Sequence, residues 1–368
     1  MLDRLLLYWS LVLVLPIPTF AADNAINNSQ DGKEPAAAKY SALQDLGTLG
    51  GKSAGIGGIS ADGSVVVGTL RFADETWHVF RWTQSGGLQD LGTLGGKLAW
   101  TTGVSADGSV VVGGISSADG VYHAFRWTQS GGLQDLGTLG AKLAWSTGVS
   151  ADGSVVVGHL KFPDGTVHVF RWTQSGGSKD LGPPQDTPPS PTAVSADGLV
   201  IVGYIWLPDN TKHAFRLTQA GNLQDLGTFG GQSTFANGVS ADGSVIVGNI
   251  KFADGTFHAF RWTQSGGAQD LGTFGGKGAR ADGVSADGAV IVGTIQLAAG
   301  ITHAFRWTQS GGAQDLGTLG GQSTSANGVS ADGSVVVGAI QFADGSSHPF
   351  VAPIGKNGQA VMKTAVSP

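Results

Sequence analysis

The sequence contains 368 residues, carries a formal net charge of -6 and has no cysteine. The absence of cysteine excludes disulfide bridges and thiolate metal sites, so the fold must be stable through packing alone. The net negative charge and the scattered lysines exclude the basic stripe by which proteins bind nucleic acid.

The N-terminal residues have the pattern of an export signal. Arg4 precedes an apolar run from Leu5 to Leu15, which is followed by prolines and by small residues suited to cleavage. This order predicts a signal peptide over residues 1–21, and the apolar run is shorter than the roughly 20 residues that span a membrane. Residues 22–39 carry almost no large apolar side chains and are expected to form a flexible leader. We therefore expect an exported protein, secreted, periplasmic or bound to the cell surface, without an integral membrane segment after signal cleavage.

Residues 40–355 consist of seven copies of a 45-residue repeat, without insertion or deletion. The aspartates of the motif QDLGT, which reads KDLGP in the fourth copy, are Asp45, Asp90, Asp135, Asp180, Asp225, Asp270 and Asp315. The histidines of HAF, HVF or HPF are His78, His123, His168, His213, His258, His303 and His348. The aspartates of the motif SADG are Asp62, Asp107, Asp152, Asp197, Asp242, Asp287 and Asp332. In-register copies of this kind predict a repeat architecture.

Each repeat contains the signals of four short strands. One unit, residues 101–145, reads TTGVSADGSVVVGGISSADGVYHAFRWTQSGGLQDLGTLGAKLAW. Its two Asp-Gly pairs favour hairpin turns, and the sequence SGG marks a third turn. The predicted strands are GVSA, SVVVGGI, YHAFRWT and LQDLGTL, and a glycine-rich link leads to the next unit.

Four strands in each 45-residue unit predict an all-β fold, namely a seven-bladed β-propeller of four-stranded antiparallel blades. The alternative is an elongated β-solenoid. The chain begins with the last strand of a unit, Ala42–Thr48, and ends with the first three strands of a seventh unit. We therefore expect the N-terminal strand to complete the last blade, with residues 356–368 as a tail or as an alternative closing partner.

The segments HAFRWTQSGGLQDLGTLGG and GVSADGSVVVG resemble the HAF-repeat family of bacterial extracellular proteins over about residues 40–350. Such repeats also occur in the passenger regions of autotransporter-like proteins. The resemblance therefore implies a secreted or surface location. It implies no catalytic activity.

The repeated polar residues include the types found in catalytic triads, for example His78, Asp45 and Ser60. Each type recurs in every repeat, which is typical of a structural hydrogen-bond network, whereas an enzyme needs one pre-organised site. An isolated Asp-Gly pair supplies one carboxylate, whereas Ca²⁺ takes about six to eight oxygen ligands. We therefore expect no catalytic residue, no metal site, no cofactor and no enzymatic activity.

Two positions of the repeat vary and carry aromatic residues in several copies. The position before the HAF histidine is occupied by Trp77, Tyr122, Val167, Lys212, Phe257, Thr302 and Ser347. A position in the predicted glycine-rich link is occupied by Gly55, Trp100, Trp145, Ser190, Phe235, Arg280 and Ser325. In a four-stranded meander the FADG-type hairpin and the link to the next unit emerge at the same rim, and the SADG and TQSGG turns at the other. Variation at one rim is expected of a binding surface, or of exposed positions that drift freely.

The predicted rim residues for ligand binding are Trp77, Trp100, Tyr122, Trp145, Trp206, Phe235, Phe257 and Arg280. The fourth repeat departs most from the pattern, with GPPQDTPPSP over residues 182–191, Trp206 in place of Arg71, Ser116 or Lys161, and Leu217 in a tryptophan position. We interpret this departure as decay of the repeat rather than as a partner site.

The leading hypothesis for function is a secreted or cell-surface interaction module whose ligand is a glycan or a protein. Nucleic acid is not an expected partner. One alternative is a structural, passenger-like surface protein without a ligand. The other is a hydrolase or lyase with a site in the central channel, which would require unlike catalytic residues from different blades.

Overall fold

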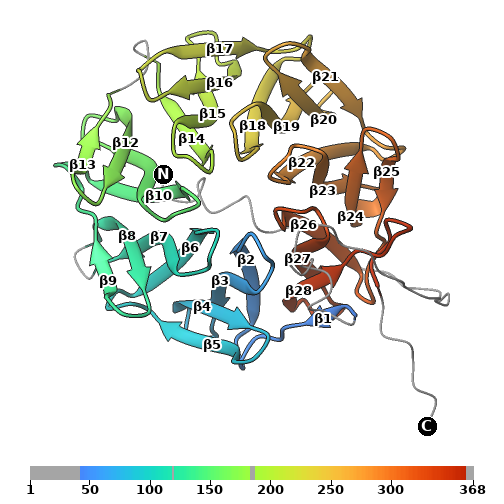
Figure 1. Cartoon of the computed structure of the whole chain (residues 1–368), viewed down its shortest axis with the longest axis horizontal. Coiled ribbons are helices and arrows are strands. Elements are labelled where there is room, and N and C mark those ends of the chain that lie inside the picture. Colours follow the sequence, from blue (N-terminus) through green and yellow to red (C-terminus); the bar gives the residue numbers. More distant parts are fainter. Residues whose placement is uncertain (1–41, 118–119, 183–186, 362–368) are drawn as a thin grey trace, which may run out of the picture.

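The computed structural model describes residues 42–117, 120–182 and 187–361. It consists of seven four-stranded antiparallel units arranged in a ring around a central axis (Figure 1). This arrangement confirms the predicted all-β, seven-bladed propeller and excludes the β-solenoid. The predicted signal peptide, residues 1–21, and leader, residues 22–39, lie outside the described residues. Blades 1 to 7 are numbered here in chain order.

Within each blade the strands run from the axis outwards in chain order (Figure 1). The innermost strands are β2 (Ser53–Ile59), β6 (Leu98–Val104), β10 (Leu143–Val149), β14 (Pro189–Val194), β18 (Ser233–Val239), β22 (Gly278–Val284) and β26 (Ser323–Val329). The second strands are β3 (Val65–Arg71), β7 (Val110–Ser116), β11 (Val155–Lys161), β15 (Val200–Trp206), β19 (Val245–Lys251), β23 (Val290–Gln296) and β27 (Val335–Gln341).

The third strands are β4 (Trp77–Thr83), β8 (Tyr122–Thr128), β12 (Val167–Thr173), β16 (Lys212–Thr218), β20 (Phe257–Thr263), β24 (Thr302–Thr308) and β28 (Ser347–Pro353). The outermost strands are β5 (Gly87–Gly92), β9 (Gly132–Asp135), β13 (Gly177–Asp180), β17 (Leu223–Gly227), β21 (Gly267–Gly272), β25 (Gly312–Asp315) and, in blade 7, β1 (Gln44–Asp45). The helical content of the described residues is one 3₁₀ turn, η3 (Ala298–Gly300).

The two ends of the propeller carry different loops. The upper end, as we call it, contains the FADG-type hairpins between the second and third strands and the crossovers between blades. The lower end contains the SADG turns and the TQSGG turns. The innermost strands differ from the prediction, because β6 begins at Leu98, within the predicted link. Its first residues pair with Gly113–Ser116, since the seven-residue second strand offers backbone partners along its whole length.

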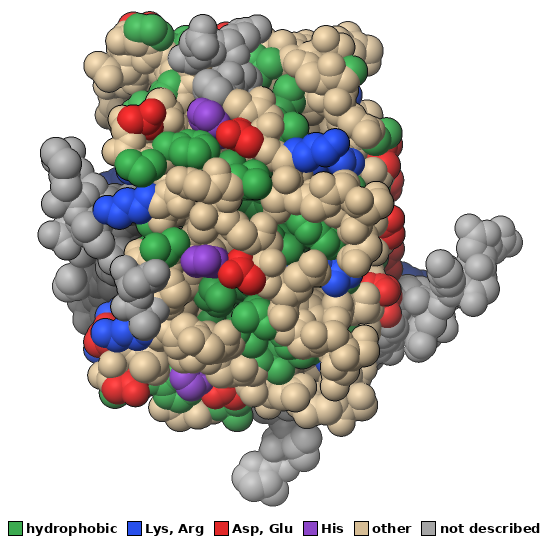
Figure 2. Space-filling model, turned by 90° about the vertical axis from the view of Figure 1, so that its left-hand side faces the viewer, with side chains coloured by type: hydrophobic (Ala, Val, Ile, Leu, Met, Phe, Trp, Pro, Cys, Tyr) green, Lys and Arg blue, Asp and Glu red, His purple; other side chains and the backbone are tan. Residues whose placement is uncertain are grey.

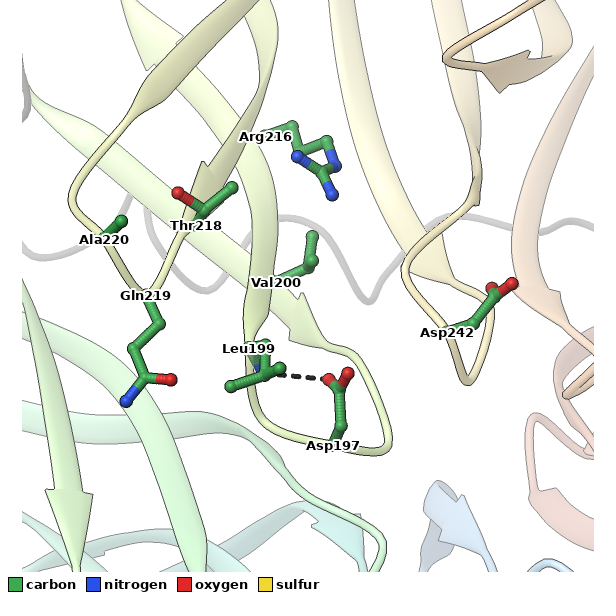
Figure 3. Close-up of a pocket in the computed structure, with 8 residues that line it drawn as sticks. All are labelled: Asp197, Leu199, Val200, Arg216, Thr218, Gln219, Ala220 and Asp242. Atoms are coloured by element: carbon green, nitrogen blue, oxygen red, sulfur yellow. Dashed lines mark hydrogen bonds between the residues drawn. The ribbon is translucent and has the colours of Figure 1, made fainter.

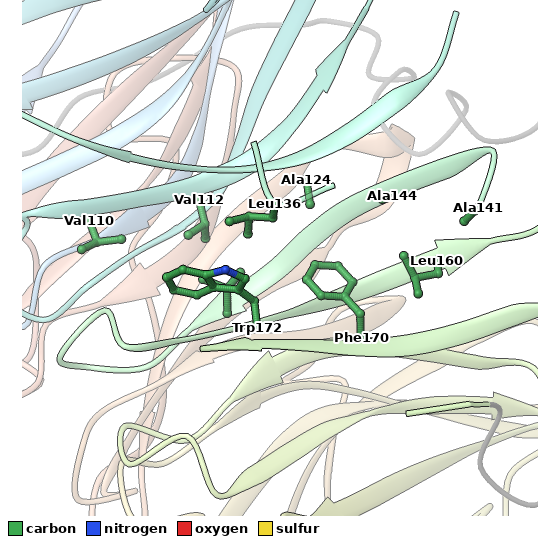
Figure 4. Close-up of a cluster of buried hydrophobic side chains, with 10 residues drawn as sticks. Val110, Val112, Ala124, Leu136, Ala141, Ala144, Leu160, Phe170 and Trp172 are labelled. Atoms are coloured by element: carbon green, nitrogen blue, oxygen red, sulfur yellow. The ribbon is translucent and has the colours of Figure 1, made fainter. Parts of the chain in front are cut away.

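The hydrophobic core lies between neighbouring blades. The apolar run of the second strand is covered on both faces, as expected, and Val110, Val111 and Val112 are at most 2% exposed. Figure 4 shows the interface of blades 2 and 3, where Phe170 and Trp172 of blade 3 pack against Val112 and other residues of blade 2. Burial of side chains of this size contributes about 1.5–3 kcal/mol each. The constant phenylalanines and tryptophans are therefore packing residues, as predicted for the tryptophans.

Every HAF histidine is bonded to the aspartate of the neighbouring outermost strand. In blade 1 the Nδ1–H of His78 donates to the Asp90 carboxylate over 2.8 Å. The equivalent pairs are His123–Asp135, His168–Asp180, His213–Asp225, His258–Asp270, His303–Asp315 and His348–Asp45. Figure 2 shows purple histidines beside red carboxylates on the outer surface. The histidine column therefore joins the outer two strands of each blade.

The SADG turns tie the blades together at the lower end. The backbone N–H of the turn alanine in each blade donates to the carbonyl oxygen of the same alanine in the next blade, and Ala331 of blade 7 donates to Ala61 of blade 1 over 2.9 Å. Seven such bonds form a closed ring around the axis. Within each turn the serine also accepts a backbone N–H and donates to the aspartate, as Ser60 does with Val65 and Asp62.

The ring closes through both ends of the described chain. Strand β1 pairs antiparallel with β28, and the Asp45–His348 pair crosses this junction, so the N-terminal strand completes blade 7 (Figure 1). The first part of the predicted tail is also bound there. Ile354 and Ala360 form a bridge, and the Leu43 N–H donates to the Val361 carbonyl oxygen over 2.6 Å.

Blade 4 keeps the full architecture despite its divergent sequence. Its strands β14 to β17 form an antiparallel sheet in sequence order. Leu217 occupies the tryptophan position and remains only 5% exposed. The sequence departures of this blade therefore do not interrupt the ring.

Candidate binding site at the channel mouth

The innermost strands enclose a cavity of about 290 Å³ on the propeller axis. Its lining consists of the last residues of these strands, next to the SADG turns, so the cavity lies in the lower part of the channel. One position of the repeat contributes polar side chains to its wall, and its members are Thr102, Thr147, Thr192, Asn237, Asp282 and Asn327. Two residues further along each innermost strand, Ile59 in blade 1 and a valine in each other blade add apolar side chains to the lining. The size is close to the lower limit of small-molecule sites, which is about 300 Å³.

This polar column was not among the residues predicted from the sequence. Each member lies three residues before the serine of the SADG motif, separated from it by a Gly-Val or Ala-Val pair. Blade 1 carries Gly57 at this position. The signal that could have identified it is variation between copies inside an otherwise constant segment.

Some members of the column connect neighbouring blades. The Thr102 hydroxyl donates to the Ser146 carbonyl oxygen over 3.0 Å, and the Thr192 hydroxyl donates to that of Ala236 over 2.8 Å. These hydroxyl groups therefore have a structural role as well as a place on the cavity wall.

Asp282 is the one ionisable side chain among the described residues that line the cavity. Burial raises its pKa, and this effect exceeds the opposing effects of Arg280 and of a hydrogen bond from Thr294. The Arg280 guanidinium lies 3.7 Å from the carboxylate, and the Asn237 amide lies 3.4 Å from it. The cavity therefore contains a poorly solvated carboxylate beside amide and hydroxyl groups.

Four of the predicted binding residues occupy the innermost strands just above this column. Trp100, Trp145, Phe235 and Arg280 lie on β6, β10, β18 and β22. Their predicted position in a glycine-rich link was wrong, because the strands begin before them. They nevertheless lie at the upper end, as expected, and Arg280 keeps 49% of its side chain exposed.

The two tryptophans of this group, Trp100 and Trp145, form aromatic pairs within their own blades. The ring of Trp100 lies 5.6 Å from that of Tyr122, and the ring of Trp145 lies 4.9 Å from the His159 imidazole. Burial lowers the pKa of His159 to about 3, so this imidazole is neutral at physiological pH. The half-buried rings of Trp100, Tyr122 and Trp145 therefore offer neutral aromatic surface at the upper end, whereas His159 is buried against Trp145.

A third aromatic cluster lies between blades 4 and 5. The rings of Tyr204 and Phe235 are 5.1 Å apart, and the Lys212 ammonium lies 3.9 Å from the ring centroid of Trp206. Trp206 is 41% exposed. The structure thus brings the predicted residues Trp206 and Phe235 to one cluster, together with two residues that were not predicted.

The remaining candidates are distributed around the ring. Trp77 lies on β4 of blade 1 opposite Arg71, and Phe257 lies on β20 of blade 5 opposite Lys251. The eight predicted residues therefore surround the upper end over six blades and do not converge on one point.

The residues of the possible triad are not brought together. His78 is bonded to Asp90, whereas Asp45 is bonded to His348 in blade 7. Ser60 donates to Asp62 at the lower end. Among residues 42–117, 120–182 and 187–361, no group of three or more histidine or acidic side chains is arranged to hold a metal ion.

A second, shallower hollow of about 560 Å³ lies at the lower end of blade 4 (Figure 3). Asp197 and Leu199 come from the SADG turn of blade 4, Gln219 from its other lower turn, and Asp242 from the SADG turn of blade 5. Leu199 is 43% exposed and replaces a residue that is serine in most copies. This hollow is broad and open. The central channel, together with the aromatic residues above it, combines more kinds of polar and aromatic groups.

No protein-family model and no curated protein matches this chain. Among solved structures, the β-propeller domain of the Trilobed protease from Pyrococcus furiosus is similar, with a TM-score of 0.58 and 14% identity over 82% of this chain and 95% of that one. Puromycin hydrolase gives a TM-score of 0.55 and 15% identity over 90% of this chain. TolB from Acinetobacter baumannii gives a TM-score of 0.46 and 13% identity over 81% of it. This chain spans 55% of the puromycin hydrolase and 65% of the TolB chain.

The similarities to the Trilobed protease domain and to puromycin hydrolase support the propeller fold and correct one expectation. The repeat pattern led to the expectation that the protein is not an enzyme. Because the same fold is present in a protease and in a hydrolase, a regular propeller does not exclude enzymatic activity, and that expectation is overturned. The low identities assign no activity to this chain. Within its described residues, no helix has the length and apolar character needed to cross a membrane.

Proposed function

We propose that this protein is an exported β-propeller that binds a glycan at its upper end, around the mouth of the central channel. The observation that carries the proposal is the distribution of sequence variation. Residues that vary between repeats gather at the upper parts of the strands and in the polar column of the channel, whereas the turns of the lower end are nearly constant. Contacts between neighbouring blades explain why the lower turns are constant, but they do not explain why aromatic side chains recur among the variable residues of the upper end.

The chemistry of the upper end supports a sugar ligand. A sugar ring has an apolar face of C–H groups and an edge of hydroxyl groups. Trp100, Tyr122 and Trp145 are half-buried and provide flat apolar surfaces. Asn237 and Asp282 provide hydrogen-bonding groups deeper in the channel, two residues further along the innermost strands. A few polar groups among aromatic side chains are typical of ligand sites.

The exported location is part of the same proposal. It rests on the N-terminal sequence over residues 1–21 and on the resemblance of the repeat to the HAF-repeat family, of which we propose that the protein is a member. N-terminal sequencing of the protein from culture medium or periplasm tests it. A mature chain that begins close to residue 22 is expected, and an uncleaved cytoplasmic chain would contradict the proposal.

A glycan array tests the binding function. We expect the intact protein to bind a restricted set of glycans, and Trp100→Ala and Trp145→Ala each to weaken binding at least about tenfold, as removal of a central aromatic contact does. The matched controls are Gln129→Ala and Gln174→Ala, which alter exposed lower-end residues of the same blades and should leave binding unchanged. Absence of any bound glycan, or unchanged binding by both tryptophan variants, would refute the proposal.

A further inference from the structure

The departures of blade 4 from the repeat gather in one place. Tyr204, Trp206 and Lys212 stand at positions where the other blades carry no tyrosine, no tryptophan and no lysine, respectively. All three lie at the upper end of the blade, on β15 and at the start of β16. Because blade 4 keeps its four strands, decay of the repeat does not explain why these changes coincide.

The three residues form a single cluster with Phe235 of blade 5. The Lys212 ammonium lies 3.9 Å from the ring centroid of Trp206, 5.0 Å from that of Phe235 and 5.6 Å from that of Tyr204. The junction of the blades is fixed here, since the Lys212 backbone N–H donates to the Ser233 hydroxyl over 3.0 Å. A cation within about 6 Å of a ring centroid is attracted by the ring electrons.

Among the described residues, the positive charge of this cluster has no acidic partner. Within the described residues, no carboxylate forms an ion pair with Lys212 or with Lys251 of blade 5. Burial lowers the pKa of Lys212, and the like charge of Lys251 lowers it further. In contrast, Arg71 is paired with Glu75 and Arg280 with Asp282.

We propose that this cluster is a subsite for an acidic sugar, whose carboxylate binds the Lys212 ammonium while its ring lies against Trp206. The inference rests on the proposed glycan-binding function and specifies the class of ligand. Each lysine ammonium has three N–H donors, which suit a carboxylate acceptor. A cationic ligand is disfavoured, because Lys212 already occupies the space among the three rings and Lys251 adds a second positive charge.

Titration calorimetry on the mature protein tests the subsite with two carboxylate-bearing probes, oligogalacturonate and oligomannuronate, and with their methyl esters as uncharged counterparts. We expect at least one acid to bind at least about tenfold more tightly than its ester. Raising NaCl to about 0.5 M should remove most of this preference, because salt screens exposed charges.

Variants locate the interaction. Lys212→Gln should abolish the preference for the acid, and Lys212→Arg should retain most of it. Trp206→Ala should weaken both the acid and the ester, because it removes the ring surface. Lys277→Gln, at an exposed upper-end lysine, is the matched control and should change affinity less than about twofold. Circular dichroism of each variant confirms that the propeller is intact.

The outcomes separate the two proposals. Equal affinity for acid and ester, no binding of either acid, or an acid preference that persists in Lys212→Gln overturns the acidic subsite but leaves glycan binding at Trp100 and Trp145 intact. Absence of binding to every glycan on the array overturns both. Tighter binding of an oligoglutamate peptide than of either uronate, with the same dependence on Lys212, overturns the assignment to a sugar.

Discussion

The two ends of this propeller are built from turns of similar sequence but under different constraints. At the lower end every SADG turn contains glycine with a positive φ, and a Cβ atom on Gly243 would lie 2.6 Å from a methyl carbon of Val200 in the preceding blade. At the upper hairpins the equivalent positive-φ position accepts Glu75 and Asn210, and a Cβ atom on Gly255 would have no neighbour within 4 Å. The SADG glycine is therefore constant because the neighbouring blade packs against it, whereas the equivalent position of the upper hairpin has free space and accepts other residues.

The largest expected effect comes from breaking the closure that both ends share. Removal of residues 42–48 takes away β1, its pairing with β28 and the partly buried Leu43 and Leu46. Loss of these two leucines alone should lower the free energy of unfolding by up to about 3–6 kcal/mol, the value for two fully buried side chains. The free energy of unfolding is measured by urea denaturation, with tryptophan fluorescence as the signal. Asp45→Asn leaves β1 in place and changes only the carboxylate that accepts from His348 and from the Gly47 N–H, so it should cost much less. An unchanged midpoint after the deletion would contradict the closure.

The contrast between the turns can be tested with a matched pair in blade 5. Both Gly243→Ala and Gly255→Ala place a Cβ atom on a backbone with positive φ, which costs about 1–2 kcal/mol. Gly243→Ala also forces the side chain into Val200, and overpacking adds about 1–3 kcal/mol. Thermal denaturation should therefore show a clearly larger loss for Gly243→Ala. Equal losses would show that packing between blades does not explain the constancy of the lower turn.

A third prediction uses the neutral imidazole of His159 at the upper end. Its pKa in the folded protein is about 3, below the ordinary 6.5, so its contribution to stability is present above pH 6.5 and is lost as the pH falls. At about pH 5 the loss should be about 2 kcal/mol relative to neutral pH. His159→Asn, which introduces the residue type of Asn249 in blade 5, should reduce this dependence on pH. The measurement is the free energy of unfolding of both proteins at the two pH values, and parallel pH profiles would be the contrary result.

The smallest effect is expected at Asp282, and its sign is opposite. Burial raises the pKa of this carboxyl above the ordinary 3.8, so its stabilising contribution is present below that value and is lost as the pH rises through the folded pKa. Asp282→Asn should therefore stabilise the protein at neutral pH, with a smaller gain near pH 3.5. Thermal denaturation at both pH values checks this. A variant that is destabilised only at neutral pH would mean that attraction to Arg280 outweighs burial.

The sequence predicted the fold because the repeat has a fixed length and turn signals at fixed places. The seven four-stranded blades, and the closure of the ring through Gln44–Asp45, follow from this regular spacing. The site was predicted only in part. The position of Trp100 could be assigned to the upper end, but its place in a strand depends on backbone pairing with Gly114, which no local signal reveals. The contact of Lys212 with Phe235 joins two blades. It depends on how neighbouring blades are placed relative to each other, which the sequence of a single repeat does not reveal.

The most direct test of the account compares the glycan-array profiles of the intact protein and two fourfold variants. The upper-end variant replaces four residues by serine, which blade 7 carries as Ser325, and consists of Trp100→Ser, Trp145→Ser, Phe235→Ser and Arg280→Ser. The lower-end variant consists of Gln129→Ala, Gln174→Ala, Gln264→Ala and Gln309→Ala. The account predicts that both remain folded propellers and that only the upper-end variant loses its glycans. Retention of the full profile by the upper-end variant, or its loss in the lower-end variant, would contradict it.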